Sequence, residues 1–166
     1  KPEWKEGRPW LIEDAAQAFG ALRNPTSLIQ TWSFYPAKIL GCRGDGGAIT
    51  TNDKELADDV RELRNHWKSD YSRWGINSRL DNLQAALLNV RIQHIDEELE
   101  RRKEIAEKYL EELKGYIYLP DNTRARVWQD FIVRTAQRDN LYIFLKGKGV
   151  ETMKNEYQMP ILKTPA

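Results

Sequence analysis

The sequence is short of cysteine, of histidine and of net charge. Its 166 residues include one cysteine, Cys42, and two histidines, and 26 Lys and Arg residues nearly balance 25 Asp and Glu residues, for a formal charge of +1. A single cysteine excludes an internal disulfide framework and any zinc site built from several cysteines, and it fits a reducing compartment. The near-zero charge gives no long-range field toward nucleic acid or an acidic membrane surface.

Long apolar runs and secretion signals are missing as well. The chain has no apolar run of 18 residues, no signal-peptide pattern and no low-complexity tract. We therefore expect a globular, cytoplasmic protein with no membrane or nucleic-acid partner. His66 and His94 are too isolated to form a metal-binding pair, so no metal site is expected. The sequence starts without methionine and ends on an extended, proline-containing stretch, and we expect an internal piece of a longer protein.

Two short segments predict strands, residues 10–12 and the GGAITT stretch from Gly46 to Thr51. Between them we expect a loop, RNPTSLIQT, and then TWSFYPAKILGCRGDGG, which has the periodicity of neither a helix nor a strand. Asp14 closes the first strand, at the kind of edge where open α/β sheets bind their ligands. A helical or turn segment is expected from there to about Gly20.

Helical periodicity is clearest after the second strand. Asn52 followed by Glu55 resembles a capping box and starts a helix expected to reach about residue 67. A longer pattern from Leu80 to Leu113 contains no glycine or proline, and it predicts one long helix or two helices joined by a kink near His94.

The last third of the chain has a different pattern. VWQDFIVRT, residues 127–135, predicts a half-buried strand, and VETMKN, residues 150–155, a possible further strand. Between them QRDNLYIFLKGKG predicts a helix with a glycine stop. We place a domain boundary near Glu100, which gives domains at residues 1–99 and 100–166.

A carboxylate, an amide, a hydroxyl and a lysine gather where strand ends are expected. Gln17 follows Asp14 by about one helical turn, and Lys38 follows SFYPA, with Ser33 five residues before it. A lysine becomes nucleophilic when burial or a cationic neighbour lowers its pKa. Pyridoxal phosphate needs such a set: a lysine for the Schiff base, a carboxylate for the ring nitrogen, and donors for the phosphate.

Each of these residues also fits a simpler structural role. Lys38 fits a surface lysine, Asp14 fits a helix N-cap with Glu13 as the competing acid, and Gln17 and Ser33 fit side chains that satisfy the backbone of a turn. The glycines at 44, 46 and 47 precede a strand and open no helix, so they fail the phosphate-loop pattern. We expect them to form a tight turn with positive φ angles.

Three stretches resemble the DegT/DnrJ/EryC1/StrS family of pyridoxal-phosphate-dependent aminotransferases, which act on keto sugars of nucleotide sugars. They are IEDAAQAFGA, SFYPAKILGCRGDGGAITTND and RLDNLQAALLNVRIQHIDEELERRKEIAEKY. The resemblance implies an α/β protein of the fold type I (aspartate aminotransferase) class. It implies part of the large domain, with a mixed, mostly parallel sheet, followed by part of a smaller α+β C-terminal domain.

The resemblance also implies roles for single residues. Lys38 matches the lysine that forms the internal aldimine and moves the proton during catalysis, and Asp14 matches the carboxylate on the pyridinium nitrogen. Ala16 matches a small residue against one face of the ring. Gln17 matches an amide at the ring's phenolic oxygen, and Ser33 a hydroxyl at the phosphate.

One further match concerns a second subunit. Asn77 resembles the residue that reaches the phosphate bound mainly by the neighbouring subunit, which implies a homodimer with a shared active site. The implied reaction is amino transfer, with glutamate as donor, to a keto sugar carried on a nucleotide. Members that dehydrate sugars have histidine in place of the lysine, and Lys38 argues against that branch.

The sequence departs from the family pattern in three places. The phosphate-binding turn and the ring-covering aromatic that precede EDAAQ in the family are absent, and the loop between Ala21 and Ser33 is shorter. Glu156 and Gln158 replace the usual residues in a segment that contacts substrate. Two alternatives therefore stay open: a cyclitol or other keto substrate, and a truncated scaffold or regulatory member that binds no cofactor.

Overall fold

The computed structural model describes residues 11–21, 28–122 and 126–154. The chain forms two compact units. The first comprises Lys1–Lys108 and Asn122–Asp130, and the second Tyr109–Asp121 and Phe131–Ala166. The domain boundary near residue 100 stays a prediction, as do the roles of Glu156 and Gln158, which lie outside the described residues.

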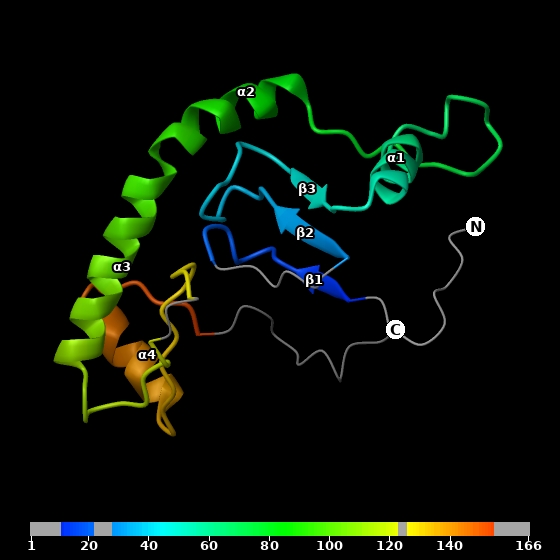
Figure 1. Cartoon of the computed structure of the whole chain (residues 1–166). Helices are drawn as coiled ribbons and strands as arrows, with labels where there is room; N and C mark the ends of the chain where they lie inside the picture. The colour runs from blue at the N-terminus through cyan, green and yellow to red at the C-terminus, as the bar shows by residue number, and fades with distance from the viewer. Residues whose placement is uncertain (1–10, 22–27, 123–125, 155–166) are drawn as a thin grey trace. The chain divides into compact units, whose positions relative to one another are not determined.

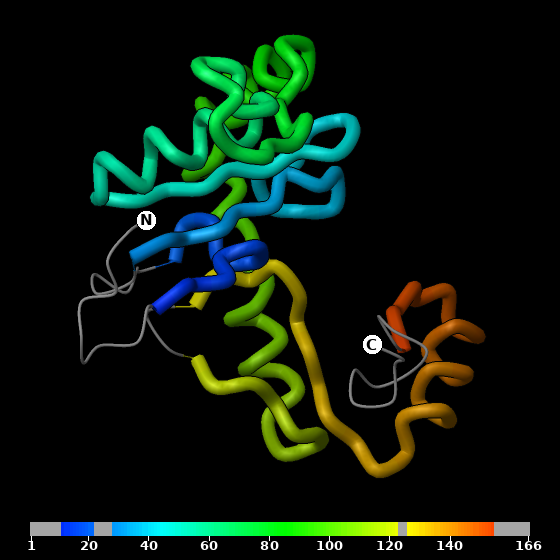
Figure 2. Tube along the Cα trace, turned by 90° about the vertical axis from the view of Figure 1, so that its right-hand side faces the viewer, coloured from blue at the N-terminus to red at the C-terminus, as the bar shows by residue number. Residues whose placement is uncertain are grey.

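A mixed three-stranded sheet forms the base of the first unit, in the order β1-β2-β3. The strands are β1 (Ile12–Asp14), β2 (Ile29–Ser33) and β3 (Gly47–Thr50). β1 pairs with β2 in parallel, whereas β2 pairs with β3 antiparallel (Figure 1). A view turned by 90° shows the same strand segments side by side (Figure 2). The prediction of a mixed sheet is therefore confirmed.

β2 corrects the sequence prediction, which placed its residues in a loop and in a stretch without strand periodicity. Apart from the buried Trp32, its side chains are half-buried on both faces of the sheet, so the strand lacks the alternation of buried and exposed residues by which a strand is predicted. Trp32 is buried, and its Nε1 donates to the Thr50 hydroxyl on β3 at 3.0 Å. The Trp32 ring also meets Phe19 edge-on, with centroids 5.9 Å apart. β1 begins at Ile12, later than predicted, and ends on Asp14.

The glycine-rich return into β3 differs from its prediction as well. Among the described residues, the glycines with positive φ are Gly20, Gly115 and Gly149, and not Gly44, Gly46 or Gly47. Close packing explains why glycine is required at two of these positions. A Cβ at Gly46 would lie 2.9 Å from the Leu80 side chain, and one at Gly47 would lie 2.6 Å from the Trp32 carbonyl oxygen.

α1 (Lys54–Leu63) follows β3, but the predicted cap is displaced by one residue. The Asp53 side chain, and not that of Asn52, accepts the Leu56 N–H at 3.1 Å. The helix also ends four residues before the predicted residue 67, where His66 and Trp67 adopt positive φ angles of 63° and 52°. On its exposed face, the hydrogen bond from Lys54 lowers the pKa of the Asp58 carboxyl.

The long helical pattern forms two helices joined by a short 3-10 turn. α2 (Asn82–Arg91) leads into η1 (Ile92–His94), and α3 (Ile95–Glu112) follows. This break confirms the alternative of two helices with a kink near His94. Leu88 of α2 and Ile95 of α3 are buried.

The second unit contains α4 (Arg138–Gly147), and Gly149 follows it with φ +76°, which confirms the predicted helix and its glycine stop. The two strands predicted in the last third of the chain are wrong over the described residues. Residues 127–135 contain a single bridge, from Arg134 to Tyr118, and residues 150–154 are irregular. Alternation produces a strand only when a neighbouring strand satisfies its backbone, and here the pairing is limited to one residue.

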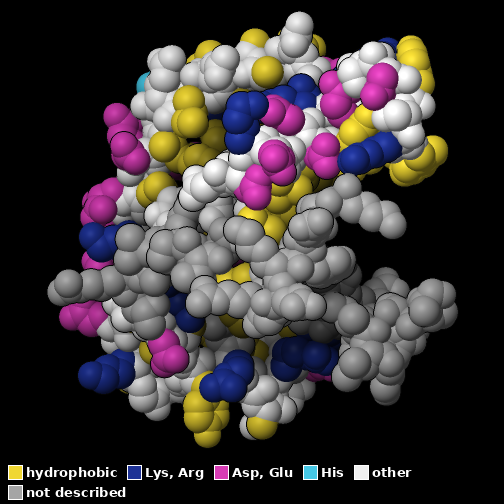
Figure 3. All heavy atoms as spheres, turned by 45° about the vertical axis from the view of Figure 1, so that its right-hand side comes forward, with side chains coloured by type: hydrophobic (Ala, Val, Ile, Leu, Met, Phe, Trp, Pro, Cys, Tyr) yellow, Lys and Arg dark blue, Asp and Glu magenta, His cyan; other side chains and the backbone are white. Residues whose placement is uncertain are grey.

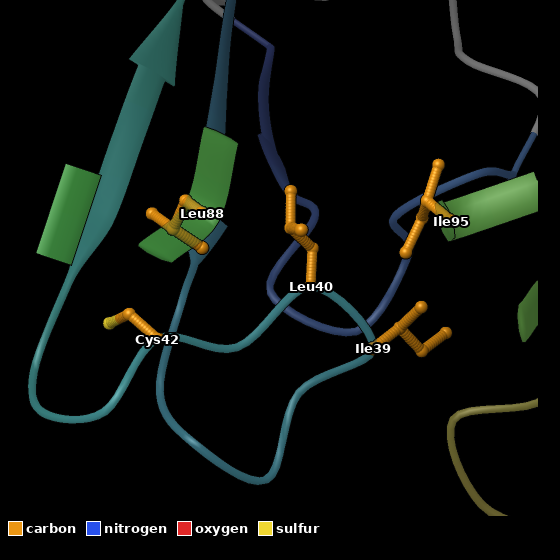
Figure 4. Close-up of a cluster of buried hydrophobic side chains, with 5 residues drawn as sticks. All are labelled: Ile39, Leu40, Cys42, Leu88 and Ile95. Atoms are coloured by element: carbon orange, nitrogen blue, oxygen red, sulfur yellow. The ribbon is translucent and has the colours of Figure 1, made fainter. Parts of the chain in front are cut away.

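The core of the first unit lies between the segment after β2 and the α2–α3 helical path. Figure 4 shows that its side chains come from the loop after β2 and from the helices. The cluster consists of Ile39, Leu40, Cys42, Leu88 and Ile95. The Cys42 thiol is buried and lies 2.9 Å from the carbonyl oxygens of Phe34 and Gly44.

Acidic and basic side chains of the described residues are interspersed on the face that Figure 3 shows. Within the described ranges, no helix combines the length and the apolar character needed to cross a membrane.

Substitution of Gly47 by alanine is expected to destabilise the protein. The new Cβ would overlap the Trp32 carbonyl oxygen of the paired strand, and such overpacking typically costs about 1–3 kcal/mol. Urea denaturation of Gly47→Ala measures this change. Gly147→Ala is the matched control, because a Cβ there meets no atom within 4 Å. Equal midpoints for the two variants would contradict the prediction.

Candidate active site

The parallel pairing of β1 and β2 brings their carboxyl ends to one edge of the sheet. In the register of this pair, Asp14 lies opposite Thr31, so Ser33 ends β2 two residues beyond the level of Asp14. The Ala15 N–H, directly after β1, donates to the Thr31 carbonyl at 2.9 Å and continues the pairing. Two of the predicted site residues are thus held near one edge by the sheet itself.

The segment after Asp14 forms turns instead of a regular helix. The Asp14 carboxylate accepts the Ala16 N–H at 3.1 Å through Oδ1, an Asx-type contact that shapes the turn. Ala15 is buried at 1 % exposure and anchors the segment, Ala16 is half-buried, and Gln17 is exposed. The second carboxylate oxygen of Asp14 has further capacity to accept hydrogen bonds.

Ser33 stands where β2 gives way to the loop. Its hydroxyl oxygen accepts the Tyr35 N–H at 3.3 Å, and the side chain is half-buried. A hydroxyl that accepts one hydrogen bond still has its own hydrogen to donate. Ser33 therefore stabilises the turn and retains a donor for an anionic ligand.

Lys38 lies on the loop from Phe34 to Cys42. The loop is closed at its base, because the Cys42 N–H donates to the Phe34 carbonyl at 2.8 Å. The Lys38 N–H donates to the Tyr35 carbonyl at 2.8 Å, and the residue is half-buried beside Ile39, which is 1 % exposed. None of the ion pairs between described residues includes Lys38.

Hydrophobic packing connects the Lys38 loop to the segment after Asp14. Ile39 and Leu40 belong to the buried cluster, and Phe19 packs against that cluster from the Asp14 side. Because Phe19 also contacts Trp32 of β2, the turn after β1 and the loop after β2 share one apolar support. The structure thus brings the segments of Asp14, Ala16, Gln17, Ser33 and Lys38 into the same part of the first unit.

Asn77 lies elsewhere in that unit. It is exposed, and its backbone pairs with that of Asn65, just after α1. The described part of the chain also contains no cluster of three or more His, Cys, Asp and Glu side chains placed to hold a metal ion.

Two residues that sequence reasoning missed hold the Lys38 loop. Arg91, at the end of α2, donates to the carbonyl oxygens of Gly41 and Ile39, the latter at 3.1 Å, and forms an ion pair with Glu98 at 3.2 Å. Gln129 forms two hydrogen bonds to the same loop, 90 residues away in sequence. No local pattern marks either residue, since both act on backbone groups of a distant segment.

The mixed sheet, with its acid and lysine loop at one edge, belongs to a partial fold type I transferase domain. The sequence matches the DegT/DnrJ/EryC1/StrS aminotransferase family over residues 6–166, so the chain belongs to this family. The resemblance inferred from sequence motifs is thereby confirmed.

Curated relatives are named as sugar aminotransferases. A Streptomyces venezuelae protein, dTDP-3-amino-3,4,6-trideoxy-alpha-D-glucose transaminase, is 41 % identical over 94 % of this chain and 44 % of its own length. A Pseudomonas aeruginosa protein, UDP-2-acetamido-2-deoxy-3-oxo-D-glucuronate aminotransferase, is 40 % identical over 98 % of this chain and 48 % of its own length. The chain therefore spans less than half the length of these relatives.

A solved structure shows the same fold. The crystal structure of S. venezuelae DesV in complex with a ketimine intermediate matches with a TM-score of 0.87 and 42 % sequence identity. The match covers 94 % of this chain and 45 % of the DesV chain.

Replacement of Arg91 by methionine is expected to lower the free energy of unfolding by roughly 1–3 kcal/mol. Methionine preserves most of the side-chain volume but leaves the carbonyl groups of Ile39 and Gly41 without their charged donor. Chemical denaturation of Arg91→Met measures the loss. Arg101→Met is the matched control, because the ion pair of Arg101 with Glu104 is exposed, and such pairs contribute little. A loss of equal size in both variants would contradict the prediction.

Proposed function

We propose that the protein transfers an amino group from glutamate to a keto sugar carried on a nucleotide, with pyridoxal phosphate bound at the carboxyl edge of β1 and β2. One observation carries this proposal. The loop that immediately follows β2 presents Lys38, half-buried and without an ion-pair partner among the described residues, at the edge where β1 ends on Asp14. A structural surface lysine has no need of this placement.

The donor set at this edge fits the chemistry of pyridoxal phosphate. Asp14 has a carboxylate oxygen with capacity to accept the pyridinium N–H, and Ser33 has a hydroxyl hydrogen for a phosphate oxygen. Ala16 offers a small side chain to a planar ring, and Gln17 an exposed amide for the phenolic oxygen. When bound, the cofactor supplies an aldehyde and an electron-withdrawing ring.

Lys38 has two tasks in the proposed reaction. Its amine would hold the cofactor through the aldehyde, with loss of water, and when free it would move the proton at the reacting carbon of the substrate. Its anchorage fits both tasks, because Ile39 beside it is buried while Lys38 itself is half-buried.

The substrate proposal includes a ring position. The two curated relatives differ in nucleotide, dTDP in one and UDP in the other, but both names place the amino or oxo group on carbon 3. This agreement supports a nucleotide-linked 3-oxo sugar. A substrate screen with 3-oxo and 4-oxo sugars on both nucleotides tests the position, and a preference for cyclitol ketones would instead favour the alternative substrate class.

The proposed active protein is a homodimer in which Asn77 of each subunit reaches the phosphate site of the other. Asn77 is exposed, which suits contact with a second copy. Sedimentation of the complete protein tests the dimer. The cytoplasmic location stays a prediction from the sequence.

Borohydride reduction of the complete protein with pyridoxal phosphate is expected to attach the cofactor to Lys38. Peptide mass spectrometry locates the label, and Lys38→Arg should abolish both the label and the visible absorbance of lysine-bound cofactor. Lys54→Arg, on the exposed face of α1, is the matched control and should retain both. Label on another lysine would disprove the proposed role of Lys38, and no binding at all would favour the non-catalytic alternative.

Neutralisation of Asp14 is expected to slow amino transfer roughly 10- to 150-fold, since a hydrogen bond to a charged group contributes about 1.5–3 kcal/mol. The comparison is the kcat of Asp14→Asn with that of Glu13→Gln. Both changes remove one negative charge, but successive residues of a strand point to opposite faces. Equal losses in the two variants, or a larger loss in Glu13→Gln, would contradict the role of Asp14 as the acid that holds the cofactor.

A further inference from the structure

The side chain of Gln129 binds the backbone on both sides of Lys38. Its Nε2 donates to the Ala37 carbonyl at 2.8 Å, and its Oε1 accepts the Ile39 N–H at 3.0 Å. One amide group thus uses its donor on the residue before Lys38 and its acceptor on the residue after it. Gln129 lies within the same compact unit as the loop.

These two hydrogen bonds act on the conformation of Lys38 directly. The Ala37 carbonyl belongs to the peptide plane that precedes the Lys38 Cα, and the Ile39 N–H belongs to the plane that follows it. Peptide planes are rigid, so the soft backbone variables at this position are the φ and ψ angles of Lys38. A group that holds both planes therefore holds φ and ψ, and with them the direction in which the side chain leaves the loop.

Gln129 is itself held in place from the helical side. The Arg102 guanidinium donates to the carbonyl oxygens of Trp128 at 3.1 Å and of Gln129 at 3.4 Å. Trp128 is buried at 7 % exposure, and the Arg126 guanidinium lies over its ring, 5.2 Å from the centroid. The backbone that carries the Gln129 amide is thus anchored by contacts of its own.

The other polar anchor of the loop acts on a different segment. Arg91 binds the carbonyl oxygens of Ile39 and Gly41, which belong to peptide planes after those that flank Lys38. Arg91 therefore stabilises the return of the loop toward β3, whereas the contacts of Gln129 are confined to the two planes beside the lysine. Gln129 therefore acts on the orientation of Lys38, whereas Arg91 acts on the stability of the loop as a whole.

We propose that Gln129 is a positioning residue that sets the direction of the Lys38 side chain and so aligns its amine with the cofactor. The proposal rests on the proposed function, in which Lys38 binds pyridoxal phosphate. The chemistry requires an amide, because the site needs one donor and one acceptor on the same planar group. A carboxylate of the same shape keeps the bond to the Ile39 N–H and loses the bond to the Ala37 carbonyl.

The test compares Gln129→Met and Gln129→Glu in the complete protein. Amide hydrogen exchange at Ile39, measured without cofactor, reports the hydrogen bond from the Ile39 N–H to Gln129. Loss of this bond in Gln129→Met should speed exchange about 3- to 10-fold. With pyridoxal phosphate bound, the pH midpoint of the visible absorbance of lysine-bound cofactor reports the alignment of the amine. This midpoint should shift in both variants, and kcat should fall by a larger factor than KM changes.

Gln93→Met is the matched control, because Gln93 is exposed on η1, and it should leave exchange, midpoint and kcat unchanged. Faster exchange at Ile39 with an unchanged midpoint and kcat would show that Gln129 is only structural and would overturn the proposal, as would no change in any readout. If Gln129→Met loses its fold, the midpoint and kcat of Gln129→Glu decide between the two outcomes. Absence of lysine-bound cofactor in the unsubstituted protein would instead disprove the proposed function, while amide exchange at Ile39 would still report its hydrogen bond to Gln129.

Discussion

The parallel pairing of β1 with β2 is the constraint on which the candidate site depends. It gives both strands the same direction, so the residues that end them, Asp14 and Ser33, lie at one edge of the sheet. Parallel strands cannot be joined by a tight hairpin, and the carboxyl ends of such strands are where α/β proteins place ligands. The acid and the lysine loop therefore share an edge although β1 and β2 are separated along the chain.

The loop that carries Lys38 is built to be rigid on one side and open on the other. Ile39 and Leu40 are buried against the helical path, and the Cys42 N–H closes the loop onto Phe34. The half-buried lysine between these anchors has no ion-pair partner among the described residues. Burial of the neighbouring side chains offsets the conformational entropy that is lost when the loop becomes ordered. The lysine amine is therefore not needed to hold the loop and stays available for chemistry.

Local patterns predicted the helices better than they predicted the strands. The kink near His94 and the glycine stop at Gly149 follow from periodicity and from the conformational range of glycine. β2 was missed because its side chains are covered on both faces and do not alternate, and residues 127–135 were wrongly predicted as a strand because alternation does not supply a pairing partner. Strand formation is decided by non-local partners, which a local pattern does not contain.

The sequence by itself determined which groups are present and in what order: an acid after an apolar segment, then a hydroxyl, then a lysine before a glycine-rich return. These depend on residue identity and short-range spacing. Only the tertiary structure decided how the lysine is held, because Arg91 and Gln129 reach the loop from positions 50 to 92 residues away. Their hydrogen bonds end on backbone groups, which every residue carries, and so leave no signature in the residues that they bind.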